Sequence, residues 1–356
     1  MIGRIFGLVF LAALIAAGAW VYFFLRDAGA LRTIAPKGVG ACTTVTGGEI
    51  VGVEDLTIDP LTKVAFLAGY DRRADTPATT ARGAIWTYDL AERGDPVDAT
   101  ASALPGGFSP HGISLWRGAD GRKVLFAINH ADGKHTIEVF DVNGAALAHR
   151  RTIEGLELVS PNDIVGVGPD AFYVTNDHAN TTGWRRLAED YLRLKETKVY
   201  HYDGQRFTQA LDRIGGANGI NVSADGKALY LSAGSEGKVY VFDRDATTNA
   251  LVQRDAVIVP GFADNIEVLA SGDLLLGVHS KILQLLAHFG DASKRAPSHV
   301  MHLKANSRSG FTAETIYYND GEEISGASVG ASVDRRLLIG AIFEPKILDC
   351  AWEAAS

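Results

Sequence analysis

Polar side chains recur along the chain at the start of short apolar segments, at intervals of about 50 to 60 residues. They are Glu54, His111, Asn162, Asn218, Asp264 and Asn265, with Ser325 in a sixth, less regular segment. Carboxylate and amide oxygens are hard ligands, and a loose set of several of them favours Ca²⁺ over Mg²⁺ or Zn²⁺. If the segments converge, the predicted ligands are Glu54, Asn162, Asn218, Asp264 and Asn265. The alternative is that these are ordinary turn-forming residues.

A second set of carboxylates lies directly beside the first. Asp55 follows Glu54, and Asp163 follows Asn162. Because consecutive residues of a strand point to opposite faces, the two aspartates would meet behind the first set. There they could hold a second, more buried Ca²⁺. A capping or turn role for each aspartate is the alternative interpretation.

Two histidines are placed to supply acid–base chemistry beside the predicted metal. If two consecutive apolar segments form a hairpin about Asp120-Gly121, His111 at the start of one strand lies across from His130 at the end of the next. Imidazoles take up and release protons near neutral pH. The pair is therefore predicted to activate water.

The same pairing of residues across a hairpin gives secondary candidates for the site. It sets His279 opposite Asn265, and it sets Asn176 and Asp177, which precede His178, opposite Asn162. Asp177, His178 and His279 are therefore further candidates for the site. The other histidines have no such placement and are expected to be surface or packing residues: His135, His149, His201, His288, His299 and His302.

The segments that carry these residues share one plan. Each polar residue leads into an apolar strand, a tight turn and a second apolar strand, as in residues 218–222 and 228–231 around Asp225-Gly226. A repeat of about 50 residues is typical of four-stranded propeller blades, whose first strands surround a central channel. The sequence thus predicts an all-β fold, a six-bladed β-propeller over residues 32–356. Five or seven blades are the alternatives.

Composition excludes several other classes of protein. The chain has 356 residues, of which 47% are apolar and 21% charged, so a disordered protein and a disulfide-dense miniprotein are both excluded. The formal net charge is −8, and the sequence shows no concentrated basic face. We therefore expect no nucleic-acid partner.

The N-terminus carries a separate apolar segment within residues 1–31. Ile5 to Leu25 has no charged residue and would reach about 31 Å as a helix, which is enough to span a bilayer. We predict an uncleaved signal anchor. The alternatives are a cleavable signal, since Ala17-Gly18-Ala19 resembles a processing site, and a buried core helix.

The two cysteines lie at opposite ends of the remaining chain. A disulfide between Cys42 and Cys350 would fasten the two ends of a propeller and would indicate an oxidising compartment. The domain is therefore expected on the extracytoplasmic side of the membrane. Two buried free thiols are the alternative.

One segment departs from the strand pattern. Trp184 to Glu196 has apolar residues at near-helical spacing with charges between them, which predicts a short amphipathic helix inserted in the third blade. It would lie over one face of the propeller or touch the membrane. Simple packing on the propeller is the alternative.

From about Cys42 to Cys350 the sequence resembles the paraoxonase and arylesterase family of six-bladed propellers. The stretches that carry the resemblance are Gly52-Val53-Glu54-Asp55-Leu56, Pro110-His111-Gly112-Ile113-Ser114, Asn129-His130, Pro161-Asn162-Asp163-Ile164-Val165, Ala217-Asn218-Gly219-Ile220-Asn221 and Asp264-Asn265-Ile266. The resemblance implies two Ca²⁺ ions. The catalytic ion is implied on Glu54, Asn162, Asn218, Asp264 and Asn265, and the structural ion on Asp55, Asp163 and the backbone carbonyl of Ile113.

The resemblance also implies a proton-relay role for His111 and His130, and a disulfide between Cys42 and Cys350. The predicted function is Ca²⁺-dependent hydrolysis of lactones and aryl esters. In it, a Ca²⁺-polarised carbonyl is attacked by water that His111, assisted by His130, deprotonates. The predicted partners are a small-molecule lactone or ester and the membrane. The alternative is a membrane-tethered propeller that binds a ligand or protein and uses calcium only for its structure.

Overall fold

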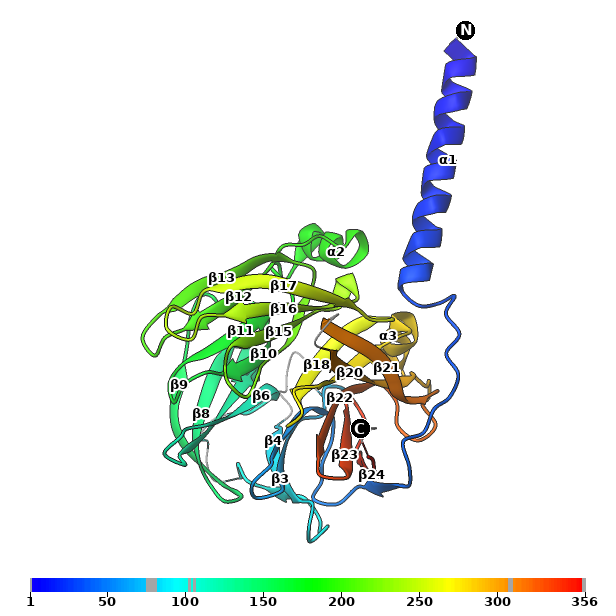
Figure 1. Ribbon diagram of the computed structural model, residues 1–356. Coiled ribbons are helices and arrows are strands. Elements are labelled where there is room, and N and C mark those ends of the chain that lie inside the picture. Colours follow the sequence, from blue (N-terminus) through cyan, green and yellow to red (C-terminus); the bar gives the residue numbers. More distant parts are fainter. Residues whose placement is uncertain (1, 75–81, 102–103, 105–106, 307–309, 354–356) are drawn as a thin grey trace.

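The computed structural model describes residues 2–74, 82–101, 104, 107–306 and 310–353. These residues form six four-stranded antiparallel sheets arranged around a central axis (Figure 1). The predicted six-bladed propeller is therefore confirmed, and the alternatives of five or seven blades are wrong.

Consecutive strands form the first three blades. Blade one contains β2 (Val53–Asp59), β3 (Val64–Gly69), β4 (Ala84–Asp89) and β5 (Val97–Asp98). Blade two contains β6 (Pro110–Arg117), β7 (Lys123–Asn129), β8 (Thr136–Asn143) and β9 (Ala146–Ile153). Blade three contains β10 (Pro161–Gly166), β11 (Phe172–Asn176), β12 (Thr197–Tyr202) and β13 (Phe207–Ile214).

Blades four and five are also built from consecutive strands, whereas blade six takes one strand from the start of the chain. Blade four contains β14 (Ala217–Val222), β15 (Ala228–Ala233), β16 (Lys238–Arg244) and β17 (Leu251–Ile258). Blade five contains β18 (Phe262–Val268), β19 (Leu274–His279), β20 (Ser298–Asn306) and β21 (Gly310–Asn319). Blade six contains β22 (Ala327–Val333), β23 (Arg336–Ala341), β24 (Ile347–Ala351) and, at its outer edge, β1 (Cys42–Val45).

The hydrophobic core lies between neighbouring blades. Between blades one and two, for example, Phe66, Ile85, Ile113 and Phe140 form part of one buried cluster and are at most 3% exposed. Complete burial of such a side chain contributes about 1.5–3 kcal/mol. The apolar residues of each strand thus hold adjacent sheets together and leave the polar residues of the first strands toward the axis.

Each of the six described inner strands contains a β-bulge at its polar start. On β6 the register passes from Pro110 opposite Asn129 to Ile113 opposite Ala127, and the other five inner strands shift at the equivalent place. A bulge re-aims side chains and bends the strand. The simple hairpin registers predicted for His279 and Asn176 are therefore wrong, because their partners are Phe262 on β18 and Pro161 on β10.

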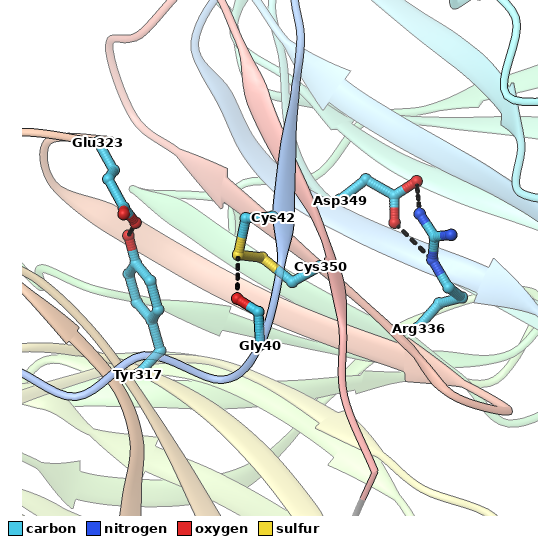
Figure 2. Close-up of a disulfide and its surroundings, with 7 residues drawn as sticks. All are labelled: Gly40, Cys42, Tyr317, Glu323, Arg336, Asp349 and Cys350. Atoms are coloured by element: carbon cyan, nitrogen blue, oxygen red, sulfur yellow. Dashed lines mark hydrogen bonds and ion pairs between the residues drawn. A yellow bond between two sulfur atoms is a disulfide. The ribbon is translucent and has the colours of Figure 1, made fainter.

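A disulfide closes the ring of blades. Cys42 on β1 pairs with Cys350 on β24 in the strand register, and their sulfurs are bonded (Figure 2). The predicted disulfide is confirmed, and the alternative of two free thiols is wrong. The two cysteines are 308 positions apart in the sequence. By lowering the entropy of the unfolded chain, the bond therefore stabilises the folded state by up to about 6 kcal/mol.

The N-terminal helix α1 (Ile2–Asp27) projects away from the propeller (Figure 1). The most apolar 18-residue window within its segment Arg4–Asp27 has a mean hydropathy of 2.4 and is unburied, so the alternative of a buried core helix is wrong. The helix is long and apolar enough to span a membrane, and a signal sequence would have the same properties.

Two further helices lie on loops between strands. α2 (Gly183–Leu192) lies between β11 and β12, and α3 (Ile282–Gly290) lies between β19 and β20. The sequence pattern did not predict α3, because charges do not alternate with its apolar residues as they do in α2. Two short 3₁₀ turns, η1 (Ala131–Gly133) and η2 (Gly234–Glu236), complete the described elements.

Candidate active site and metal centre

The five predicted ligands of the first Ca²⁺ all lie in the bulged starts of inner strands. Glu54 is on β2, Asn162 on β10, Asn218 on β14, and Asp264 and Asn265 on β18. All five side chains are at most 5% exposed. Asn265 crosses to the first blade, where its Nδ2 donates to Glu54 Oε1 at 2.9 Å.

Two glycines allow the inner strands to approach at this level. A Cβ at Gly112 would lie 2.5 Å from the Cα of Asp163, and a Cβ at Gly219 would lie 2.4 Å from the backbone oxygen of Asp264. Neither contact is possible for a larger residue without moving the backbone. The glycine that follows a polar residue on β6 and β14 therefore lets neighbouring strands pack closely around the channel.

Buried oxygens without partners test whether these residues fit a cation. Four of the predicted ligand oxygens are buried and accept no hydrogen bond: Glu54 Oε2, Asn162 Oδ1, Asn218 Oδ1 and Asn265 Oδ1. Leaving such an acceptor unpaired costs about 1–3 kcal/mol. Within the described ranges, no three His, Cys, Asp or Glu side chains form a metal cluster, so amide oxygens are needed for a complete set. An oxygen-only set of this kind fits Ca²⁺.

The two carboxylates of this set differ in their electrostatic surroundings. Burial alone would raise the pKa of Glu54, but the nearby imidazole of His111, the Arg72 guanidinium and the Asn265 amide together lower it. Burial raises the pKa of Asp264, against the effect of His279, whose Nε2 lies 2.6 Å from Asp264 Oδ2. His279, a secondary candidate, thus contacts a predicted ligand.

The predicted second pair of carboxylates is also buried. Asp55 Oδ2 accepts the backbone N–H of Ile113 at 2.7 Å, and Asp163 Oδ2 accepts that of Ile220 at 2.7 Å. Burial raises the pKa of both aspartates well above its usual range, and the charge of Asp55 raises that of Asp163 further. Two buried carboxylates that repel each other fit a cation between them. Asp55 contacts the backbone amide of Ile113 and not its carbonyl in this hydrogen bond. A ligand role for the Ile113 carbonyl stays a prediction.

The structure brings the two predicted histidines together. His111 Nδ1 lies 2.9 Å from His130 Nε2, and His111 Nε2 lies 3.4 Å from Glu54 Oε2. His111 is 19% exposed. Burial, followed by the charges of His111 and His135, lowers the pKa of His130 well below its usual value. His130 is therefore neutral at pH 7.

A third histidine contacts the pair. His135 Nδ1 lies 2.7 Å from His130 Nδ1, so the expectation that His135 is only a surface or packing residue is wrong. The turn η1 and the following Lys134 separate the two histidines and reverse the chain between β7 and β8. Asp132 and Gly133 in this turn have positive φ. A turn predicted from Asp132-Gly133 would have been the signal that His130 and His135 are neighbours.

Asp177 and His178 connect the channel to α2. His178 Nδ1 lies 2.8 Å from Asp177 Oδ1, and its Nε2 lies 3.1 Å from Asp190 Oδ1 on α2. Burial alone would lower the pKa of His178, but these two carboxylates raise it to about 9. His178 is therefore a cation at neutral pH that holds α2 near the end of β11.

An open cavity of about 560 Å³ adjoins this cluster. Asp177 and His178 line one side, and α2, α3 and the end of α1 supply apolar walls that include Phe24, Tyr191 and Leu286. The rings of Phe24 and Tyr191 are 6.0 Å apart, so the end of α1 contacts α2 directly. The cavity can hold a small apolar molecule beside the polar end of the channel.

Comparison with known proteins agrees with this geometry. A sequence model named Arylesterase matches residues 41–351, almost the entire propeller. The chain belongs to the arylesterase family. Membership supports an enzyme of the esterase and lactonase class, as predicted, rather than a propeller that only binds a ligand or protein.

Individual members of the arylesterase family match over nearly their full length. Serum paraoxonase/arylesterase 2 of Bos taurus is 31% identical over 314 residues, which cover 85% of this chain and 86% of the relative. Serum paraoxonase/lactonase 3 of Oryctolagus cuniculus is 30% identical over 351 residues, which cover 95% and 96%. A solved structure of regucalcin from Agrobacterium tumefaciens, described as a calcium-binding protein, is similar in fold with a TM-score of 0.53 at 15% identity, covering 89% of this chain and 95% of that one.

Proposed function

We propose that this arylesterase-family chain hydrolyses lactones and aryl esters in a Ca²⁺-dependent reaction. The observation that carries the proposal is the set of four buried ligand oxygens that accept no hydrogen bond, one of which, Glu54 Oε2, lies 3.4 Å from His111 Nε2. The relatives named for arylesterase and lactonase activity support the same class of substrate. The substrate partner is a small ester or lactone.

Glu54, Asn162, Asn218, Asp264 and Asn265 would hold the catalytic ion, and Asp55 and Asp163 the structural one. Bound Ca²⁺ would supply positive charge that polarises the substrate carbonyl and stabilises the developing oxyanion. His111 Nε2 faces the ligand set and accepts a proton from the attacking water, while its Nδ1 is held by His130. The residues of the chain thus either transfer a proton or orient the group that transfers it.

A serine nucleophile is the main chemical alternative, because Gly326-Ala327-Ser328-Val329-Gly330 matches the pattern of a nucleophile elbow. An elbow places its serine on an exposed turn between a strand and a helix. Ser328 instead lies within β22 and is 0% exposed, and its hydroxyl donates to the backbone oxygen of Glu54 at 2.5 Å. Its position supports a structural role, and the proposal uses water as the nucleophile.

Hydrolysis of phenyl acetate and δ-valerolactone, measured with and without a calcium chelator, tests the proposed function. We expect both activities to be lost when Ca²⁺ is removed and to return when Ca²⁺ is added, because four ligand oxygens lose their counter-charge. Metal content is measured in parallel. Full activity in a sample shown to be free of Ca²⁺ would contradict the proposal.

We also propose that α1 anchors the protein in a membrane and that residues 32–356 form an extracytoplasmic hydrolase domain. The length and hydropathy of α1 support the anchor, and the disulfide supports an oxidising compartment. N-terminal sequencing of the membrane fraction should find residues 1–31 still attached, and added protease should reach the propeller without lysis of the membrane that α1 spans. A mature chain that begins after Ala19 would instead indicate a cleaved signal.

A further inference from the structure

Three imidazoles form a continuous chain from the channel toward solvent. His111 lies 3.4 Å from Glu54 at the channel, His130 lies 2.9 Å from His111, and His135 lies 2.7 Å from His130. His135 is partly exposed at the outer end of the chain. The ring centroids of His130 and His135 are 4.8 Å apart and the planes nearly perpendicular, and the two Nδ1 atoms face each other.

We propose that His135 completes a three-imidazole relay that carries protons between His111 and solvent during ester hydrolysis. His135 acts through His130 and does not touch the substrate, so it is a positioning and proton-conducting residue. The inference rests on the proposed function, because it uses His111 as the group that takes a proton from water.

The order of the nitrogens fixes which tautomer each ring must adopt. For His111 Nε2 to accept a proton, the ring proton of His111 must lie on Nδ1 and be donated to His130 Nε2. The ring proton of His130 must then lie on Nδ1 and be donated to His135 Nδ1. His135 carries its own proton on Nε2. An acceptor at the position of His135 therefore favours the tautomer of His130 that leaves His111 ready to act as a base.

Over one turnover, the relay releases one proton to solvent and takes one back. When water attacks, its proton goes to His111 Nε2, one proton moves along each of the two inner hydrogen bonds, and His135 Nε2 releases one to solvent. When the tetrahedral intermediate collapses, the C–O bond to the leaving group breaks. The leaving oxygen then takes a proton from His111 Nε2 while the chain moves its protons back and His135 takes one from solvent. The rings return to their first tautomers, and the carboxylic acid product ionises in water.

The need for the returning proton depends on the leaving group. A lactone leaves as an alkoxide, which is a strong base and must be protonated, whereas phenyl acetate leaves as a phenoxide, whose conjugate acid has a pKa of about 10. Loss of His135 should therefore slow lactone hydrolysis more than phenyl acetate hydrolysis. A general structural defect would slow both to the same extent.

The test uses the full chain in detergent micelles with Ca²⁺ and compares His135→Ala with wild type. We expect kcat for δ-valerolactone to fall roughly tenfold, which is less than the loss of a whole acid–base group. The fall for phenyl acetate should be smaller, and KM should be unchanged. Added imidazole should restore lactone activity in a concentration-dependent manner, because it can occupy the space left by the side chain.

His149→Gln is the matched control. His149 is also in blade two and 19% exposed, but it bonds Glu138 through Nε2 at 2.9 Å and is not part of the chain of imidazoles. We expect its ratio of lactone to phenyl acetate activity to equal that of wild type, with no effect of imidazole. A His135→Ala variant with wild-type kcat for both substrates would overturn the inference. An equal loss for both substrates without rescue would also overturn it.

Imidazole ¹⁵N chemical shifts provide a readout that does not depend on turnover. With histidine-labelled protein we expect His130 to be protonated on Nδ1 in wild type, and this tautomer to be less populated in His135→Ala. If the wild-type chain hydrolysed neither substrate, the proposed function would fail, and the tautomer of His130 would still decide whether His135 orients it. If His111→Gln kept full activity, the relay would be excluded, whereas the hydrolase activity itself would stand.

Discussion

The Glu54→Gln variant is expected to lose about a hundredfold or more of its esterase activity and most of the stabilisation that Ca²⁺ provides. Glu54 is the predicted ligand carboxylate whose pKa is lowered, because the His111 imidazole, the Arg72 guanidinium and the Asn265 amide together outweigh its burial. Its Oε2 is one of the four unpaired oxygens. Replacing the carboxylate by an amide removes a full charge from the ligand set, and about 3 kcal/mol of lost transition-state stabilisation corresponds to roughly a hundredfold in rate.

The effect of this substitution on stability should change sign with calcium. Four carboxylates are buried around the channel, and the charge of Glu54 raises the pKa of Asp55, Asp163 and Asp264. Without a cation, Glu54→Gln relieves part of this repulsion, so the variant should be at least as stable as wild type in chelator. With Ca²⁺, wild type gains stability according to its affinity, whereas the variant gains little.

Thermal unfolding in Ca²⁺ and in chelator measures both effects. Asp349→Asn is the control, because Asp349 is similarly buried but bonds Arg336 of blade six and Tyr88 of blade one and contacts none of the predicted ligands (Figure 2 shows its bonds to Arg336). It should lower stability by the same amount in both conditions. If Glu54→Gln retained the calcium-dependent shift in unfolding temperature, Glu54 would not be a ligand.

The sequence predicts the ring of polar residues because inner strands repeat the same plan once per blade. Glu54, Asn162, Asn218 and Asp264 each precede an apolar strand at similar spacing, and a propeller places such positions around one channel. The periodic pattern therefore contains both the blade count and the members of the ring. The terminal disulfide follows from the same closure, because the first and last strands must meet.

Other features of the site depend on local geometry that periodicity does not contain. A β-bulge adds a residue to one strand without changing which residues are apolar, so strict alternation misplaces the partner of His279. His135 contacts His130 because the backbone of Asp132 and Gly133 adopts positive φ, which a reading of strands alone does not consider. Ser328 shows the converse, since its pattern matches a catalytic turn but its flanking residues form a strand. In each case the deciding property is backbone conformation.

The His111→Gln variant separates proton transfer from metal binding. A glutamine amide can keep a hydrogen bond to His130 but cannot accept a proton from water, so kcat should fall by about a hundredfold to ten thousandfold. Because His111 is not among the predicted ligands, the calcium-dependent shift in unfolding temperature should remain. Phenyl acetate, which has the better leaving group, should lose less activity than δ-valerolactone.

Steady-state kinetics on both substrates, with thermal unfolding of the same samples, distinguish the roles of the two residues. Glu54→Gln should lose activity and the calcium response together, whereas His111→Gln should lose activity alone. His149→Gln again controls for the loss of an imidazole in blade two, since the His149 side chain bonds Glu138 and contacts neither His111 nor His130. A His111→Gln variant with wild-type kcat would assign deprotonation of water to another group. A variant that also lost the calcium response would show that His111 supports the ligand set through Glu54, from which its Nε2 is only 3.4 Å away.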